Sequence, residues 1–438
     1  MNAGRDEGAV VPGADTAGAV ASAPTLASLL HDDLVSWDVL ERRYGSLLEL
    51  VRVLLGVVPN CDRYLEIWPP GFRSYNVMVP NFLNLPAPIV GVGGAPGDVV
   101  GLGMYVASRV AECPYCTAHS CSFALRRGAS AQKVAQALVA DRTSFAPGEL
   151  ATVAVARALA RVPSELTAAE RDELLRAYGP KHAEWIVLGI VMMGFLNKFM
   201  NAIGVELEQP VASEVCTTLG SDWEPGAAGA QLDPALPPAA PPSADGLSTK
   251  LRVIPLLPSA LRLDARWQRG VPGRWPAAGT FLRQRTGHDF PVLAHLQHRR
   301  AARAVATMLR DNLDPASSVI GLRAKVLAGA VFAEVVSDAA LAGDMRALTA
   351  TAAVPAAELQ AGVAFARGSD EAITGLDATA RALLLLSRAA SPSPAEITAD
   401  VVAALREAGV SAVAIVELVT WLSVLQMLHR LSAFYTTE

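Results

Sequence analysis

Three of the five cysteines and one of the seven histidines lie within nine residues, the segment CPYCTAHSC at positions 113–121. Two thiols separated by two residues can close a small disulfide ring, and a nearby imidazole can carry protons to and from sulfur. The types and spacing of these residues therefore predict thiol–disulfide exchange or the reduction of a peroxide by a thiol.

The proline in this segment predicts how the thiols are placed. Pro114 suits the first turn of a helix but not its interior, so Cys113 is expected at the N-cap and Cys116 within the first turn. Both sulfurs would then lie near the positive end of the helix dipole, which lowers a thiol pKa and favours the thiolate. His119, three residues after Cys116, falls on the same side of the helix and could exchange protons with it.

The expected chemistry follows from the pair of thiols. A thiolate that attacks the O–O bond of a hydroperoxide becomes a sulfenic acid, and the neighbouring cysteine condenses with it to a disulfide. An external dithiol must then reduce that disulfide. Glu112, directly before the motif, is either a carboxylate that orients His119 or a solvated residue at a helix end.

A metal site is the alternative from another class of chemistry. Cys113, Cys116, His119 and Cys121 are residue types that zinc accepts in a tetrahedral site. Structural zinc sites usually draw their ligands from two separated pairs, and the sequence contains no second Cys/His pair of this kind. No metal or other cofactor is therefore predicted.

Composition points to an all-α protein. The chain has 438 residues, of which 52% are hydrophobic and 18% charged, and alanine and leucine are abundant whereas aromatic residues are few. A net charge of −5 without a lysine or arginine block gives no electrostatic surface for nucleic acid or an anionic membrane. The apolar stretch 185–196 is shorter than the roughly 20 residues that span a bilayer, so we interpret it as a buried core helix.

The chain divides into two similar halves. Residues 1–27 are predicted to be a tail that lacks the features of a secretory signal, and 209–250 to be a linker rich in Pro, Gly and Ala. The flanking domains are 28–208, with the cysteine pair, and 251–438, without it.

The cysteine usage fits a reducing compartment, so a cytoplasmic location is expected.

The second half is interpreted as a degenerate copy of the first. Superposition on Glu112 and Glu334 pairs Cys113 with Val335, Cys116 with Asp338 and His119 with Leu341. The second copy would thus serve as a scaffold. The apolar helices expected at 185–204 and 411–432 are predicted to pack around the helix of the motif and to close an apolar pocket.

The motif with its surroundings resembles the AhpD-like branch of the carboxymuconolactone decarboxylase superfamily. The resemblance rests on the segment CPYCTAH followed by ALRRGAS, covers roughly residues 90–205, and recurs more faintly over 320–435. It implies an all-helical, often oligomeric thiol peroxidase in which Cys116 attacks the peroxide and Cys113 resolves the intermediate. The decarboxylase branch generally lacks this cysteine pair.

Two positions depart from the pattern of that branch. Ser120 stands where relatives carry a histidine, with His119 one residue earlier, and Gly101 stands where relatives carry a relay glutamate.

The function expected is reduction of an organic hydroperoxide, with a thiol or lipoyl-bearing reductant as partner and a homo-oligomeric assembly. The alternatives that remain open are a redox sensor that does not turn over, a structural relative without activity, and the metal site.

Overall fold

The expected all-α class is confirmed for the residues that the structure describes. The computed structural model describes residues 25–90, 93–139, 143–220 and 242–437. Over these ranges the chain forms α-helices and short 3-10 helices, and no strand.

The helices fall into two sets along the chain. Those before residue 220 are α1 (Leu26–Leu30), η1 (His31–Asp33), α2 (Trp37–Leu55), α3 (Cys61–Leu65), α4 (Pro69–Phe82), α5 (Ala87–Val90), α6 (Gly97–Val110), α7 (Pro114–Arg126), α8 (Ala131–Gln136), α9 (Pro147–Ala160), α10 (Ala168–Ile203) and α11 (Gln209–Leu219). Those after residue 242 are α12 (Leu247–Val253), η3 (Ile254–Leu256), α13 (Leu257–Trp267), α14 (Ala277–Thr286), η4 (Pro291–His295), α15 (Arg299–Asn312), α16 (Gly321–Val335), α17 (Ala339–Leu348), α18 (Ala356–Ala366), η5 (Asp370–Ile373), α19 (Ala378–Ala390), α20 (Ala399–Glu407) and α21 (Ala412–Thr436).

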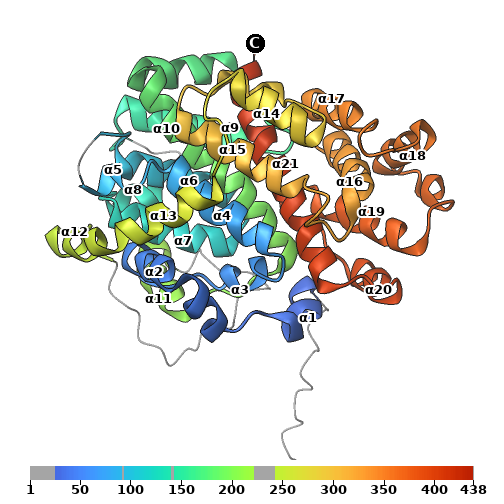
Figure 1. The fold of residues 1–438 in the computed structure, drawn as a ribbon. Coiled ribbons are helices and arrows are strands. Elements are labelled where there is room, and N and C mark those ends of the chain that lie inside the picture. The colour runs from blue at the N-terminus through green and yellow to red at the C-terminus, as the bar shows by residue number, and fades with distance from the viewer. Residues whose placement is uncertain (1–24, 91–92, 140–142, 221–241, 438) are drawn as a thin grey trace, which may run out of the picture.

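The two longest helices, α10 and α21, pack against each other in the core. Figure 1 shows α21 in red between the blue and green N-terminal helices and the orange group of α16 to α20. Both helices are long and apolar enough to cross a membrane, but 89% of the apolar window in each is buried inside the protein. Residues 185–196 belong to α10, which has 36 residues and departs from helical geometry at Gly179.

The two sets of helices do not separate into independent layers, because α4 packs against α15. Arg73 Nε lies 2.6 Å from a carboxylate oxygen of Asp311, and Asn312 Nδ2 donates to Ser74 Oγ at 3.0 Å. Helix α4 also contacts α10. The second set therefore holds in place a helix that stands beside the cysteine motif.

One turn occurs in both halves with the same backbone geometry. Glu112, between α6 and α7, has a φ of 49°, and Ser337, between α16 and α17, has a φ of 55°. In both turns the next residue caps the following helix: Cys113 through its sulfur and Asp338 through its carboxylate. The two turns are thus equivalent in structure but differ in the chemistry of the capping residue.

This equivalence corrects the register predicted between the halves. The superposition on Glu112 and Glu334 placed Asp338 opposite Cys116, whereas the caps place it opposite Cys113. The prediction is wrong because two apolar, alanine-rich helices can be aligned in several registers by composition, while a cap is fixed by the backbone.

The predicted linker is also wrong at its start. Residues 209–219 form α11, whose apolar side chains Val211, Ala212 and Val215 are buried. Helix α12 begins at Leu247, before the predicted end of the linker, and α1 begins at Leu26, inside the predicted tail. The remaining linker positions 221–241 and the tail positions 1–24 lie outside the described residues.

Candidate thiol active site

The cysteine pair lies at the start of α7 as the proline predicts. Cys113 is the N-cap residue, with φ −104° and ψ 98°, and Pro114 occupies the first turn. The Cys113 sulfur accepts a hydrogen bond from the Cys116 backbone N–H at 3.3 Å. The neighbouring Cys113 also raises the pKa of the Cys116 thiol, so the two side chains interact.

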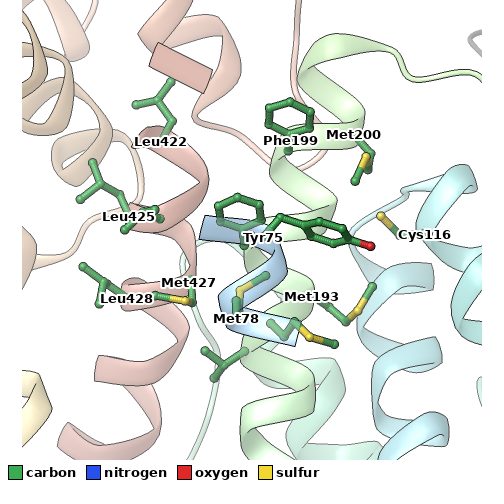
Figure 2. Packing of buried hydrophobic residues seen from close by; sticks show 14 of the residues in the cluster. Tyr75, Met78, Cys116, Met193, Phe199, Met200, Leu422, Leu425, Met427 and Leu428 are labelled. Carbon is green, nitrogen blue, oxygen red and sulfur yellow. The ribbon is translucent and has the colours of Figure 1, made fainter. Parts of the chain in front are cut away.

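Cys116 lines a largely apolar cavity of about 120 Å³, and Cys113 does not. The wall comes from α2, α3, α4, α6, α7 and α10, and it includes His119 and Ser120 as well as Cys116. Figure 2 shows Cys116 on α7 facing the side chains of Tyr75, Met193 and Met200, which line the same cavity. Cys116 is therefore the thiol of the pair that a ligand in the cavity can meet.

Helix α21 does not contribute to the wall of this cavity, contrary to expectation. The expected contribution of 185–204 is present, because Met192, Met193, Leu196 and Met200 face the cavity. The place predicted for 411–432 is taken by α2 and α4. Helix α21 instead packs on the other side of α10, as Leu422, Leu425 and Leu428 show in Figure 2.

His119 is held by a carboxylate that the sequence did not reveal. Its Nε2 lies 2.7 Å from Oε2 of Glu208, and the two side chains are 14% and 8% exposed. The other carboxylate oxygen accepts from the Tyr115 hydroxyl at 2.8 Å and from the backbone N–H of Asn60. Burial raises the pKa of Glu208, but His119 and the Asn60 N–H outweigh burial, and the pKa ends below 4.5. Glu208 is therefore an anion that orients the imidazole.

Of the two interpretations of Glu112, the structure favours a solvated residue at a helix end over a carboxylate that orients His119. Glu112 is exposed, and its contact with this region is a backbone one, its carbonyl accepting from Asn201 Nδ2 at 3.3 Å. The relay position on α6 cannot hold a carboxylate either, because a Cβ on Gly101 would lie 2.6 Å from the Cα of Ala124 on α7. Close packing of α6 on α7 leaves the carboxylate to come from another element.

The pKa of Cys116 shifts in the direction opposite to the one predicted. Burial raises the pKa of this thiol well above its ordinary value, and the neighbouring Cys113 and Cys61 raise it further. Its position near the helix N-terminus does not compensate for the loss of solvent. The resting protein thus holds Cys116 as a thiol, and a base must remove its proton.

One cation opposes this rise. Arg430 of α21 is fully buried, and its charge lowers the pKa of Cys116. Its Nη1 donates to the Ile190 carbonyl at 3.2 Å, whereas Nε and Nη2 have no hydrogen-bond partner among the described residues. Helix α21 therefore acts on the thiol through charge, although it does not line the cavity.

A third thiol shares the cavity. Cys61 on α3 is 1% exposed, lines the same wall, and lies beside the hydroxyls of Tyr75 and Tyr115. Burial and the neighbouring Asp62 raise its pKa well above its ordinary value. Cys61 carries no sequence signal, because it stands alone in the chain and meets Cys116 only through the fold.

The metal interpretation gains no support from the described residues. They contain no group of three or more His, Cys, Asp or Glu side chains placed to hold a metal ion. Cys121, the fourth ligand considered, is fully buried in the core, where desolvation raises its pKa to about 12.

Comparison with known proteins leaves the family of the chain open. No protein-family model matches the sequence, and no curated protein matches it. A crystal structure of the debrominase Bmp8 without ligand is similar to part of the fold, with 22% identity and a TM-score of 0.37, over 42% of this chain and 94% of the Bmp8 chain. A cysteine-to-alanine variant of Bmp8 in complex with 2,3,4-tribromopyrrole gives 20% identity and the same TM-score, over 42% of this chain and 95% of that chain.

The described part of this protein is thus an all-helical fold that encloses a cysteine pair, an imidazole and a carboxylate. The chemistry of the site has to follow from those residues. Cys116 contacts Cys113 and lines the same cavity as His119, whereas Glu112 is exposed and Glu208 is the carboxylate paired with His119.

Proposed function

We propose that the protein is a thiol peroxidase that reduces an organic hydroperoxide through Cys116. The observation that carries the proposal is the cavity, because its wall includes Cys116 and His119 but not Cys113. The mostly apolar wall favours an organic hydroperoxide over hydrogen peroxide.

The reaction begins with a proton transfer from the Cys116 thiol to His119, the imidazolium being stabilised by the anionic Glu208. The thiolate attacks the distal oxygen of ROOH, so that an S–O bond forms and the O–O bond breaks. The leaving alkoxide takes the proton back from His119 and departs as ROH. Cys116 is now a sulfenic acid.

Cys113 completes the cycle. Its sulfur attacks the sulfenic sulfur, water leaves, and the two cysteines form a disulfide. The sum is ROOH with two thiols giving ROH, water and one disulfide. A dithiol reductant, of the lipoyl-bearing or thioredoxin-like class, then returns the pair to its reduced state by thiol–disulfide exchange.

Trapping the intermediate tests this assignment. In Cys113→Ser, one equivalent of cumene hydroperoxide should leave a sulfenic acid on Cys116, detected by dimedone labelling and peptide mass spectrometry. Cys116→Ser should give no label at Cys113 or Cys61. Label on Cys61 or Cys113 in place of Cys116 would overturn the assignment of the nucleophile.

A redox sensor is the second candidate, and the raised pKa of Cys116 favours it. A thiol that is mostly protonated reacts slowly, so that its disulfide could form once and persist. With excess dihydrolipoamide, a peroxidase consumes many equivalents of hydroperoxide, whereas a sensor consumes about one equivalent per protein chain.

A further inference from the structure

One arginine in the cavity wall has a side chain without a full set of partners. The residues of α7 and its C-cap that line the cavity include Cys116, Ser120, Phe123 and Arg127, which recur at helical spacing along one face. Arg127 is eleven positions after Cys116, so the two Cα atoms are about 16 Å apart along the helix axis at ~1.5 Å per residue. The cavity thus has a thiol at one end of this face and a guanidinium at the other.

The guanidinium of Arg127 is buried, and it retains a donor. The side chain is 8% exposed, and Nη1 pairs with Asp245, which precedes α12. Nη2 is buried and has no hydrogen-bond partner among the described residues. The guanidinium stands 4.5 Å from the centre of the Phe123 ring, and the aliphatic stem fits beside Gly97 of α6, where a Cβ would come within 3.3 Å.

A buried N–H without an acceptor costs free energy, and a bound acceptor removes that cost. Burial lowers the pKa of Arg127 to about 10, so the side chain remains a cation at neutral pH. An anionic oxygen is the partner that such a donor binds most strongly.

The rest of the wall suits a flexible apolar chain. Between the two ends it is formed mainly by leucine and methionine side chains, with Met104, Met192, Met193 and Met200 among them. Methionine is unbranched and adapts its shape to the ligand it meets. Such a wall binds a hydrocarbon chain without demanding one particular shape.

We propose that the substrate is the hydroperoxide of a single-chain fatty acid, whose carboxylate binds Arg127 while its peroxide group reaches Cys116. The reaction step of this proposal rests on the proposed function, whereas the binding of a fatty acid to Arg127 does not depend on it. The Arg127 guanidinium lies over the Phe123 ring, one turn nearer to Cys116, so the Cα separation of ~16 Å is an upper limit on the span of the ligand. An extended chain advances about 1.25 Å per carbon, so at most about 12 carbons separate the carboxylate from the peroxide. The reaction is the one balanced above, with the lipid hydroperoxide leaving as the hydroxy acid.

Calorimetric titration with unreactive ligands tests the binding step. Dodecanoate should bind the full-length protein at least about tenfold more tightly than dodecanol, the value expected for one charge-assisted hydrogen bond. Arg127→Gln should remove that preference. Arg126→Gln is the matched control, because the neighbouring guanidinium bonds Glu214 and does not line the cavity.

A second variant keeps the test decisive if Arg127→Gln fails to fold. Asp245→Asn removes the negative charge next to the guanidinium and should tighten dodecanoate binding by about threefold or more, with dodecanol unaffected. Equal affinity for dodecanoate and dodecanol in the unmodified protein, or an acid preference that survives Arg127→Gln, would overturn the proposal.

The two proposals fail in different ways. If cumene hydroperoxide oxidises Cys116 but dodecanoate does not bind, the fatty-acid site is wrong and the peroxidase remains. If dodecanoate binds through Arg127 but no hydroperoxide oxidises Cys116, the binding site remains and the peroxidase is wrong.

Discussion

The turns before α7 and α17 share a backbone and differ in chemistry. In the first, the Cys113 sulfur accepts from the N–H of Cys116 at 3.3 Å; in the second, the Asp338 carboxylate accepts from the N–H of Leu341 at 2.9 Å. The carboxylate is the better cap, and its other oxygen lies 2.7 Å from His429 Nδ1. The comparison teaches that one backbone turn can hold either a weakly capping thiol, as before α7, or a strongly capping carboxylate, as before α17.

The largest expected effect is a difference in how much each of the two caps contributes to the free energy of unfolding. Asp338→Ala removes a cap and leaves His429 buried without its partner, which should lower the free energy of unfolding by about 3 kcal/mol. Cys113→Ala should cost about 1 kcal/mol, since a sulfur caps weakly. Urea unfolding of both variants measures the difference, and equal losses would contradict the comparison.

The second prediction contrasts the two imidazole–carboxylate pairs. Glu208→Gln should reduce the rate of Cys116 oxidation by about 100-fold, because the imidazolium loses the anion that stabilises it. Asp344→Asn, which alters the pair formed with His288 at 2.7 Å in the second half, should leave that rate unchanged. Stopped-flow kinetics measures the rate of Cys116 oxidation in both variants. Equal rates in the two variants would contradict this prediction.

The same carboxylate predicts a dependence of stability on pH. The pKa of Glu208 is lower in the folded protein than its ordinary value of 4.5, so its contribution to stability is present above that pH. The contribution is lost as the pH falls through the folded-state pKa. The difference in unfolding free energy between the unmodified protein and Glu208→Gln should therefore shrink below about pH 4.5.

The fourth prediction concerns the charge that the second half contributes to the first. Removing the Arg430 cation in Arg430→Met should raise the pKa of Cys116 and slow its oxidation at pH 7 by about tenfold. The rate should recover at higher pH. Lys198→Met removes another buried basic side chain, whose Nζ donates to the Ser391 carbonyl at 2.7 Å, and should not move the pH profile. Identical profiles for all three proteins would refute the role of Arg430.

The last prediction tests the helix contacts beneath the two turns. Gly101→Ala forces a Cβ against the Ala124 backbone and should cost about 2 kcal/mol despite the better helix propensity of alanine. Gly329→Ala on α16 meets the flexible end of Met345 and should cost less than about 1 kcal/mol. Thermal unfolding would contradict this account if Gly329→Ala were the more damaging change.

The sequence predicted what depends on neighbours in the chain. Pro114 placed Cys113 at an N-cap, and composition indicated the all-α class. Glu208 escaped prediction because it lies 89 residues from His119, and Cys61 because it meets Cys116 only through packing. The pKa direction of Cys116 was wrong because a helix start can be read from sequence, whereas the burial that outweighs it cannot.

The claim that Cys116 is the nucleophile of a cysteine pair is tested most directly by differential alkylation. The reduced protein is mixed with one equivalent of hydroperoxide, and the state of all five cysteines is read by peptide mass spectrometry. The account predicts that two thiols disappear per peroxide consumed and that both are found in a disulfide between Cys113 and Cys116. It also predicts that Cys116→Ser abolishes the loss of thiols. Peroxide consumption with Cys113 and Cys116 still reduced, or a disulfide that forms through Cys61 instead, would contradict it.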